Sequence, residues 1–345
     1  MEGGVSMYTT IRNEFCLLPK SKIKAGEGID NGIFPFFTSS DIKVSSLNSY
    51  EYDDEIVVIG TGGKPSCNYV NGKFSFSTDN YALKAKGKIE PKFLYYFLRK
   101  DGLATLQNGF HGAGLQHISK DYILNIEIPM FGRSKQQTIV RVLDDIHGMI
   151  LACQEQLTLL DELIKSRFIE MFGDPIHNTK KLQTNKVNNI VTLQRGYDLP
   201  NKQRNTEGRI PLFGANGQTD FHQYGRAKNG VITGRSGSIG NVYYCKGEFW
   251  PLNTTLFSKD THGNNVIYLC YLLRFFDLAR FSNGTGVPTL NRNLFKDEQI
   301  IDVPIDAQNR FADFVEQIDK SKFIVQERIK LYQELLNKKM DEYFN

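Results

Sequence analysis

The segment FLYYFLR at residues 93–99 returns as YLCYLLR at residues 268–274, so the chain carries one apolar pattern twice, 175 residues apart. The same shift places Gly72-Lys73-Phe74 on Gly247-Glu248-Phe249, and it places Leu115 and Pro129 on Leu290 and Pro304. A shift one residue longer places GIFPFF, residues 32–37, on GRIPLF, residues 208–213. A repeat of this length indicates two copies of a whole domain rather than a solenoid of short units.

A long helical pattern follows each copy. Apolar residues recur every three or four positions from Ile139 through Met149 to Met171, and again from Phe311 to Tyr343, which is typical of amphipathic helices. A helix from about Ser134 to Phe172 is roughly 57 Å long at 1.5 Å per residue, so one compact domain cannot cover its apolar stripe. We therefore expect the two helices to pair. The expected seam consists of Ile139, Val142, Ile146, Leu157, Leu160 and Ile164 in the first helix, and Phe314, Ile318, Val325, Ile329, Tyr332 and Leu336 in the second.

The predicted fold class is α+β, with two tandem, mixed and mostly β domains, each followed by a long helix. Segments such as EIVVIG, KFSFS, VITG and NVYYC are typical of strands, and FLYYFLRK and YLCYLLRFF of short helices. The expected boundaries are residues 1–133 and 174–305 for the domains, and 134–173 and 306–345 for the helices. Because the first helix leads the chain away to the second domain, the second helix must return, which predicts an antiparallel coiled coil.

Composition argues against several classes of protein. Hydrophobic content of 40% and charged content of 23% are ordinary for a globular protein. The five cysteines are scattered without a C-x-x-C pair, so neither a disulfide framework nor a zinc site is predicted, and reduced thiols in a cytoplasm are the simplest account. No signal pattern and no run of 18 apolar residues occurs, so we expect a cytoplasmic protein without a membrane partner.

Two glycine-rich loops separate pairs of predicted strands. Neither Gly234-Arg-Ser-Gly237-Ser-Ile-Gly240 nor Ile59-Gly60-Thr61-Gly62-Gly63 has the spacing of a P-loop or a dinucleotide fingerprint. One interpretation is a tight turn. The other is a loop whose missing side chains let a DNA duplex approach the backbone, with Arg235 reaching a phosphate or a base edge. In the first copy, Lys64 is expected where the second copy has Arg235 or Ser236.

The charge distribution favours the second interpretation. Residues 195–246 contain eight Lys/Arg and three Asp/Glu, whereas residues 134–174 contain four and seven. A basic domain on an acidic helix is the pattern of a DNA-binding domain on a protein-binding spacer, although solvated charge alone gives the same counts. Asn and Gln can pair with adenine and Arg with guanine, although polar residues are common in turns. The candidate DNA-binding residues are Thr61, Lys64, Gln116 and His117 in the first domain, and Asn216, Gln218, Arg235, Ser236, Asn291 and Arg292 in the second.

Catalytic motifs are absent from the sequence. The six histidines show no metal-ligand spacing, and neither a G-x-S-x-G elbow nor an Asn-Pro-Pro-Tyr methylation motif occurs. We therefore predict no catalytic residues, no metal and no cofactor.

Nearly the whole chain resembles a specificity subunit of a type I restriction–modification system. EGRIPLFGANG, GVITGRSGSIGNVYY and FWPLNTTLF resemble the second target-recognition domain of that family, and KIKAGEGIDNGIFPFFTSSDI and YALKAKGKIEPKFLYYFLR resemble the first. IEIPMFGRSKQQTIVRVLDDI and IIDVPIDAQNRFADFVEQID resemble the entrances to its two long helices, with Gln136 and Gln308 in matching places.

The resemblance implies a non-catalytic DNA-binding protein. Each recognition domain would read one half of a split double-stranded DNA site, and the helix pair would fix the distance between the halves. Its partners would be adenine methyltransferase subunits and restriction (translocase) subunits. Two alternatives remain open: a coiled-coil structural or regulatory adaptor with degenerate recognition domains, and a specificity subunit of another restriction class.

Overall fold

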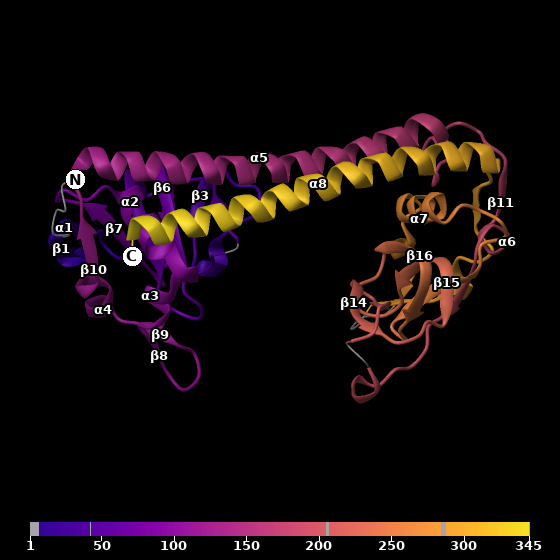
Figure 1. Cartoon of the computed structure of the whole chain (residues 1–345), viewed down its shortest axis with the longest axis horizontal. Helices are drawn as coiled ribbons and strands as arrows, with labels where there is room; N and C mark the ends of the chain where they lie inside the picture. The colour runs from indigo at the N-terminus through magenta and orange to yellow at the C-terminus, as the bar shows by residue number, and fades with distance from the viewer. Residues whose placement is uncertain (1–6, 42, 205–206, 284–287, 345) are drawn as a thin grey trace. The chain divides into compact units, whose positions relative to one another are not determined.

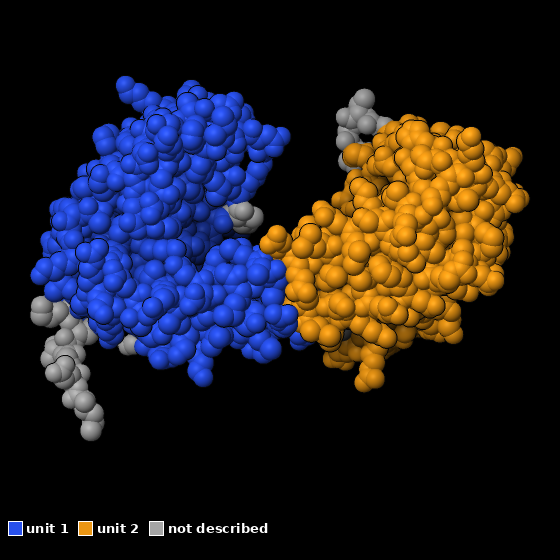
Figure 2. Space-filling model, turned by 90° about the horizontal axis from the view of Figure 1, so that it is seen from above, with its two compact units in different colours: residues 1–154, 326–345 blue, residues 155–325 orange. Residues whose placement is uncertain are grey.

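The structure is a computed structural model that describes residues 7–41, 43–204, 207–283 and 288–344. Residues 1–6, 42, 205–206 and 284–287 of the predicted domains and residue 345 of the predicted second helix lie outside it. The chain divides into two compact units (Figure 2). Unit 1 is residues 1–154 with 326–345, and unit 2 is residues 155–325. The boundary cuts both long helices, α5 (Arg133–Phe172) and α8 (Ile305–Phe344). Each unit therefore contains the start of one long helix and the end of the other.

A six-stranded sheet of the same topology forms the centre of each unit (Figure 1). The strand order is β2-β7-β5-β6-β3-β4 in unit 1 and β12-β17-β15-β16-β13-β14 in unit 2. The strands of unit 1 are β2 (Phe15–Leu17), β3 (Phe34–Phe37), β4 (Ser45–Leu47), β5 (Tyr52–Gly60), β6 (Cys67–Phe76) and β7 (Asn80–Ala85). Those of unit 2 are β12 (Thr192–Arg195), β13 (Ile210–Gly214), β14 (Gly217–His222), β15 (Ala227–Gly234), β16 (Val242–Pro251) and β17 (Thr255–Asp260). The shared order confirms the predicted duplication and the mixed, mostly β character of both copies.

Smaller elements surround each sheet. The two-stranded sheets pair β1 (Met7–Thr10) with β10 (Glu127–Met130), β8 (Phe110–His111) with β9 (His117–Ile118), β11 (Thr184–Lys186) with β20 (Gln299–Ile301), and β18 (Ser282–Asn283) with β19 (Thr289–Leu290). The short helices are α1 (Ile11–Glu14), α2 (Pro91–Arg99), α3 (Ala104–Gln107), α4 (Lys120–Asn125), α6 (Val187–Ile190) and α7 (Val266–Phe275). The 3-10 turns are η1 (Ala25–Glu27), η2 (Lys100–Leu103), η3 (Asn201–Gln203), η4 (Leu278–Phe281) and η5 (Arg292–Leu294). Helices α2 and α7 contain the repeated apolar segments, as predicted.

The alignment of the two copies changes register after α2 and α7. The segment from Arg99 to the start of β8 is three residues longer than that from Arg274 to the start of β18, so β9 corresponds to β19 with a shift of 172 residues rather than 175. The predicted equivalence of Leu115 and Leu290 is therefore wrong. Leu290 is buried at 1% exposure and corresponds to Ile118, whereas Leu115 is 68% exposed. The equivalence of Pro129 and Pro304 fails for the same reason, because β10 corresponds to β20.

Each hydrophobic core joins the sheet and its short helix to segments of both long helices. In unit 1, Phe93 of α2 packs in one cluster with Leu143 of α5 and with Met340 and Phe344 of α8. In unit 2, Tyr268 of α7 shares a cluster with Phe168 of α5 and Phe311 of α8, and Figure 1 shows α7 against the sheet of that unit. Burying such side chains contributes about 1.5–3 kcal/mol each. Neither core is complete without both helices.

All twelve predicted seam residues are buried or half-buried. Five are buried, namely Ile139, Ile146, Ile164, Ile318 and Val325. Seven are half-buried, namely Val142, Leu157, Leu160, Phe314, Ile329, Tyr332 and Leu336. Including Met149 in the stripe was wrong, because its side chain is 44% exposed, and Leu143 and Ile150 are buried instead. The spacing of three and four residues continues through Leu143, Ile146 and Ile150, which places Met149 on another face of α5.

One buried glutamine ties each long helix to its domain. Gln136 Oε1 accepts a hydrogen bond from Glu90 N at 3.0 Å, and Nε2 donates to Lys88 O and Phe131 O. Gln308 repeats the contact in unit 2, accepting from Asn265 N at 2.9 Å and donating to Val303 O. Glu90 and Asn265 are the N-cap residues of α2 and α7. Both glutamines are at most 1% exposed, so they join the starts of two helices inside the core.

Replacing Gln136 by alanine is expected to lower the free energy of unfolding of unit 1 by about 1–3 kcal/mol, because buried donors and acceptors lose their partners. Gln308→Ala should have a similar effect on unit 2. Gln156→Ala, at an exposed position of α5, is the control. Urea unfolding of the full chain measures the three effects. Equal midpoints for Gln136→Ala and Gln156→Ala would show that the buried glutamine does not stabilise the junction.

Candidate nucleic-acid interface

In unit 2, three turns meet at one end of the six-stranded sheet. The loop from Gly234 to Gly240 joins β15 to β16, and Arg235 N donates to Thr254 O at 2.8 Å in the turn between β16 and β17. Leu290 N donates to Arg235 O at 2.8 Å, which joins the loop to β19. A Cβ built on Gly234 would overlap Ser238 O and lie 3.1 Å from Ala215 O. The turn between β13 and β14 is therefore the third member of this group.

Unit 1 repeats these backbone contacts one by one. Thr61 N donates to Asp79 O at 2.9 Å, and Ile118 N donates to Thr61 O at 3.1 Å. Gly63 N donates to Gln116 O at 3.0 Å, as Gly237 N donates to Pro288 O at 3.1 Å, and both glycines have φ of +84°. A positive φ of this size favours glycine, because other residues meet steric strain there. The turns therefore have the same backbone arrangement in both units. We call this group the loop cluster: in unit 2 it consists of the loop Gly234–Gly240, the turns between β13 and β14 and between β16 and β17, and the start of β19, and in unit 1 of the equivalent turns.

The equivalence of the loops corrects one expectation. The contacts place Thr61 at the position of Arg235 and Gly63 at that of Gly237, so Lys64 corresponds to Ser238 and not to Arg235 or Ser236. The linker between β15 and β16 is one residue longer than that between β5 and β6, which moves the register. The two loops therefore present different side chains from one backbone frame.

The structure brings the sequence-predicted residues of each domain onto its loop cluster. In unit 1, Gly62 forms an isolated bridge with His117, so Thr61 and Lys64 lie beside Gln116 and His117. In unit 2, Ser236 forms the matching bridge with Thr289, and Asn291 and Arg292 follow directly. Asn216 and Gln218 lie exposed at the turn between β13 and β14. Every predicted residue except the half-buried Thr61, Arg235 and Ser236 is exposed.

Several of these side chains already hold a partner within the chain. Arg235 Nη1 donates to Asn253 O at 3.4 Å, and Arg292 Nη1 donates to Leu193 O at 2.7 Å. Asn291 Oδ1 accepts from Asn293 N at 3.0 Å, which caps the turn η5. A guanidinium has five N–H donors and an amide has two, so the groups retain donors toward solvent. These contacts hold the side chains in place for an external ligand.

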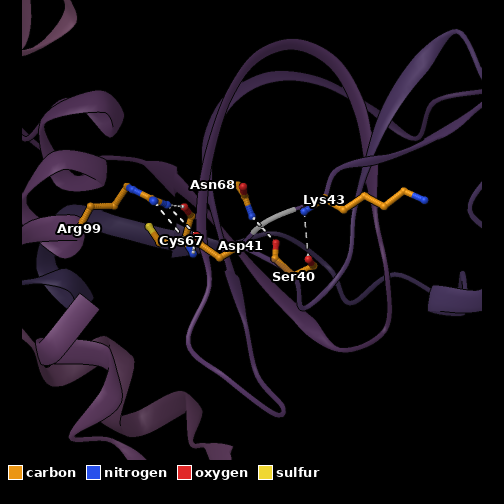
Figure 3. Close-up of polar contacts among 6 residues, drawn as sticks. All are labelled: Ser40, Asp41, Lys43, Cys67, Asn68 and Arg99. Atoms are coloured by element: carbon orange, nitrogen blue, oxygen red, sulfur yellow. Dashed lines mark hydrogen bonds and ion pairs between the residues drawn. The ribbon is translucent and has the colours of Figure 1, made fainter. Parts of the chain in front are cut away.

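An ion pair that the sequence analysis missed fixes a further loop of unit 1 (Figure 3). Arg99, at the end of α2, donates through Nη1 to Asp41 Oδ1 at 2.6 Å and to Cys67 O at 2.8 Å. Asp41 lies between β3 and β4, in the segment that also carries Ser40 and Lys43. Asn68 Nδ2 donates to Ser40 O at 3.4 Å on the same segment. The signal in the sequence was the arginine that ends both repeated apolar segments.

Within the described residues of unit 2, the counterpart arginine has no carboxylate partner. Arg274 Nη2 donates to Val242 O at 2.7 Å and contacts Cys270 Sγ at 3.7 Å. The carbonyl contact is shared, because Cys67 and Val242 begin equivalent strands. Burial raises the pKa of the Cys67 and Cys270 thiols to about 12, so both stay protonated near neutral pH and are poor nucleophiles.

No group of three or more His, Cys, Asp or Glu side chains in the described part of the chain could hold a metal ion. None of the helices within the described ranges has the length and apolar character that crossing a membrane requires.

The two domains that carry the loop clusters match a known family of domains. The family described as the type I restriction modification DNA specificity domain matches residues 14–159 and again residues 179–335. The chain therefore belongs to this family and contains two copies of its domain.

Relatives agree with this assignment. The chain is 27% identical over 161 residues to the type I restriction enzyme EcoDI specificity subunit of Escherichia coli, a match that spans 47% of this chain and 36% of the relative. It is 23% identical to the putative type I restriction enzyme specificity subunit S.HindORF215P of Haemophilus influenzae, across 91% of this chain and 87% of the relative. The crystal structure of the type I restriction–modification S subunit from M. genitalium superposes with a TM-score of 0.66 at 15% identity, covering 100% of this chain and 97% of that one. The likeness in structure shows the fold.

Replacing Arg99 by alanine is expected to destabilise unit 1 by about 1–3 kcal/mol, because Asp41 and Cys67 O lose a charged donor. Arg274→Ala should cost unit 2 less, since no carboxylate is left without its partner. Urea unfolding of both variants provides the comparison. A cost for Arg274→Ala equal to or above that for Arg99→Ala would contradict the role given to the ion pair.

Proposed function

We propose that this chain is the non-catalytic specificity subunit of a type I restriction–modification complex, and that each domain reads one half of a bipartite double-stranded DNA site. One observation carries the proposal. The same loop cluster occurs twice on the same backbone frame, and its side chains differ between the copies. Conserved backbone contacts give both clusters one way of approaching a duplex, while different side chains select different bases.

The candidate residues have the chemistry for direct base recognition. Gln116 in unit 1, and Asn216 and Gln218 in unit 2, carry exposed amides that can pair with adenine. Arg235 and Arg292 can donate to guanine or to phosphate, as Lys64 can to phosphate. Thr61, His117, Ser236 and Asn291 complete the proposed contact set. Catalysis is assigned to other subunits.

The domain division that we propose is residues 1–133 and 174–305 for recognition and residues 134–173 and 306–345 for the spacer. We propose that α5 and α8 pair along their length as an antiparallel coiled coil through the predicted seam. The support is that each core combines the start of one helix with the end of the other. A rigid spacer lets two short, weakly selective contacts act as one long site, because both must be met at one separation.

The names of the relatives support a set of proposed partners. The relatives are named as specificity subunits of type I restriction enzymes. A further similar structure, with a TM-score of 0.51, concerns complex assembly of the type I system. We propose that adenine methyltransferase subunits dock on the helix pair, that restriction (translocase) subunits join the complex, and that the complex acts in the cytoplasm.

Arg235→Ala is expected to weaken duplex DNA binding about tenfold, because one direct contact contributes roughly 1–3 kcal/mol. The matched control is Arg310→Ala, an exposed arginine on α8 outside the loop cluster. Fluorescence anisotropy with a labelled duplex at moderate salt gives both affinities. Unchanged binding by Arg235→Ala would remove the loop from the proposed interface.

Shortening the spacer is expected to change the gap between the half-sites but not the half-sites themselves. Deleting residues 154–160 and residues 323–329 removes seven residues from each helix and keeps the heptad spacing of the apolar positions. At 1.5 Å per residue the loss is about 10.5 Å, or roughly three base pairs at 3.4 Å each. Sequencing of the DNA selected by the variant measures the gap. Retention of the original gap would contradict the proposed spacer.

A further inference from the structure

Three arginines of unit 2 line one hollow beside the loop cluster. Arg195 ends β12, Arg235 lies in the loop after β15, and Arg292 begins η5. The hollow has a volume of about 260 Å³, and its remaining lining residues are Leu256, Thr289, Leu290 and Asn291. None of these lining residues carries a carboxylate, so the charge facing the hollow is positive.

Backbone contacts hold two of the three cations at the hollow. Arg292 Nη1 donates to Leu193 O at 2.7 Å, and Arg235 Nη1 donates to Asn253 O at 3.4 Å. Neutral carbonyls fix the position of the guanidinium groups without cancelling their charge. The side chain of Arg195 is 54% exposed and forms an ion pair with the exposed Asp198 at 3.8 Å, a separation longer than that of a normal hydrogen bond.

Such an arrangement favours an anion. Like charges gathered in one place repel one another, and the cost falls when a negative group enters between them. A planar guanidinium donates pairs of hydrogen bonds that match the oxygens of a phosphate. The hollow opens beside the loops that carry the candidate base-reading residues of unit 2, so an anion bound there would lie next to the DNA.

We propose that this hollow is a phosphate clamp that holds one phosphodiester group of duplex DNA, and that it anchors the second recognition domain whatever the base sequence. The inference rests on the proposed function, since it assumes that the chain binds DNA. It goes further in separating the roles of the arginines. Arg195 and Arg292 bind the DNA phosphate backbone, which adds affinity and fixes the position of the domain along the duplex. The amides of the loop cluster select the bases.

The first domain does not build the same clamp. The matching strands and turns of unit 1 place Pro19 at the position of Arg195, Thr61 at that of Arg235, and Lys120 at that of Arg292. Tyr81 stands where unit 2 has Leu256, so a larger ring occupies that part of the frame. The two domains are therefore unequal, and the second should contribute the larger sequence-independent part of DNA binding.

The salt dependence of DNA binding tests the clamp. The logarithm of the affinity falls with the logarithm of salt concentration by about 0.9 for each phosphate neutralised. We expect Arg195→Gln and Arg292→Gln in the full chain each to weaken binding to a labelled duplex of arbitrary sequence. Together they should reduce the slope by about one. Arg310→Gln, the matched control on α8, should leave the slope within error of the wild-type value.

The outcomes separate the clamp from the proposed function. Wild-type protein without salt-sensitive DNA binding would contradict the function itself. DNA binding by the wild type, with equal affinities and equal slopes for Arg195→Gln and Arg310→Gln, would leave the proposed function standing and overturn the clamp. Because the side chain of Arg195 is exposed and its ion pair with Asp198 is long, the Arg195→Gln variant should fold and keeps the test valid if Arg292→Gln does not.

A second arm distinguishes DNA phosphate from a free anion. Replacing chloride by inorganic phosphate at equal ionic strength should weaken DNA binding by the wild-type protein more than DNA binding by Arg195→Gln. In the wild type, inorganic phosphate competes with the DNA phosphate for the clamp, whereas the variant has no intact clamp to compete for. If inorganic phosphate protects the wild type from thermal unfolding while the DNA slopes of wild type and variant agree, the hollow takes a free anion and the proposal is wrong.

Discussion

The apolar faces of the two long helices are the constraint on which the rest of the structure depends. Helix α5 begins in the core of unit 1, beside Phe93 and Met340, and ends in the core of unit 2, beside Tyr268 and Phe311. Helix α8 does the reverse. Because each core needs segments of both helices, neither recognition domain can be separated from the spacer without exposing large apolar side chains to water. The buried glutamines Gln136 and Gln308 reinforce this connection, since each joins the start of a long helix to the start of a short one.

The two copies of the domain share one backbone arrangement but differ in the side chains that it carries. Strand order, the parallel pair in each sheet, and the backbone contacts of the loop cluster recur in both units. The glycines with positive φ, Gly63 and Gly237, recur at the same place because the turn requires them. Arg235 replaces Thr61, and Arg195 replaces Pro19, at positions that face the solvent side of this frame. A fold of this kind can vary the side chains of its loop cluster without changing its core.

The fold could be predicted largely from the sequence, because the features that determine it are periodic. The apolar spacing indicated α5 and α8, and the repeated segments at residues 93 and 268 indicated the duplicated domain. The register between the copies could be predicted only in part. Three additional residues between α2 and β8 in unit 1, and one additional residue in the second glycine-rich loop, shifted Leu115 and Lys64 away from their expected counterparts. Including Met149 in the apolar stripe of α5 was wrong because both Met149 and Ile150 fit an apolar pattern, and only packing decides between them.

The candidate site was less accessible to sequence reasoning. Residues of the turns were chosen for their chemistry, and the fold then gathered them from strands far apart in the chain. The ion pair of Arg99 with Asp41 and the convergence of Arg195 with Arg292 join residues that are 58 and 97 positions apart. No local pattern signals such pairs, because they depend on which strand ends meet at one edge of the sheet.

We propose that one chain reads two half-sites at a fixed separation. The most direct measurement is to express the chain with the methyltransferase subunit encoded beside it and to map modified adenines across the host genome by single-molecule sequencing. We expect a split motif whose two halves are separated by a gap of constant length. A continuous motif, or the absence of new methylation although the two proteins purify as a complex, would contradict it.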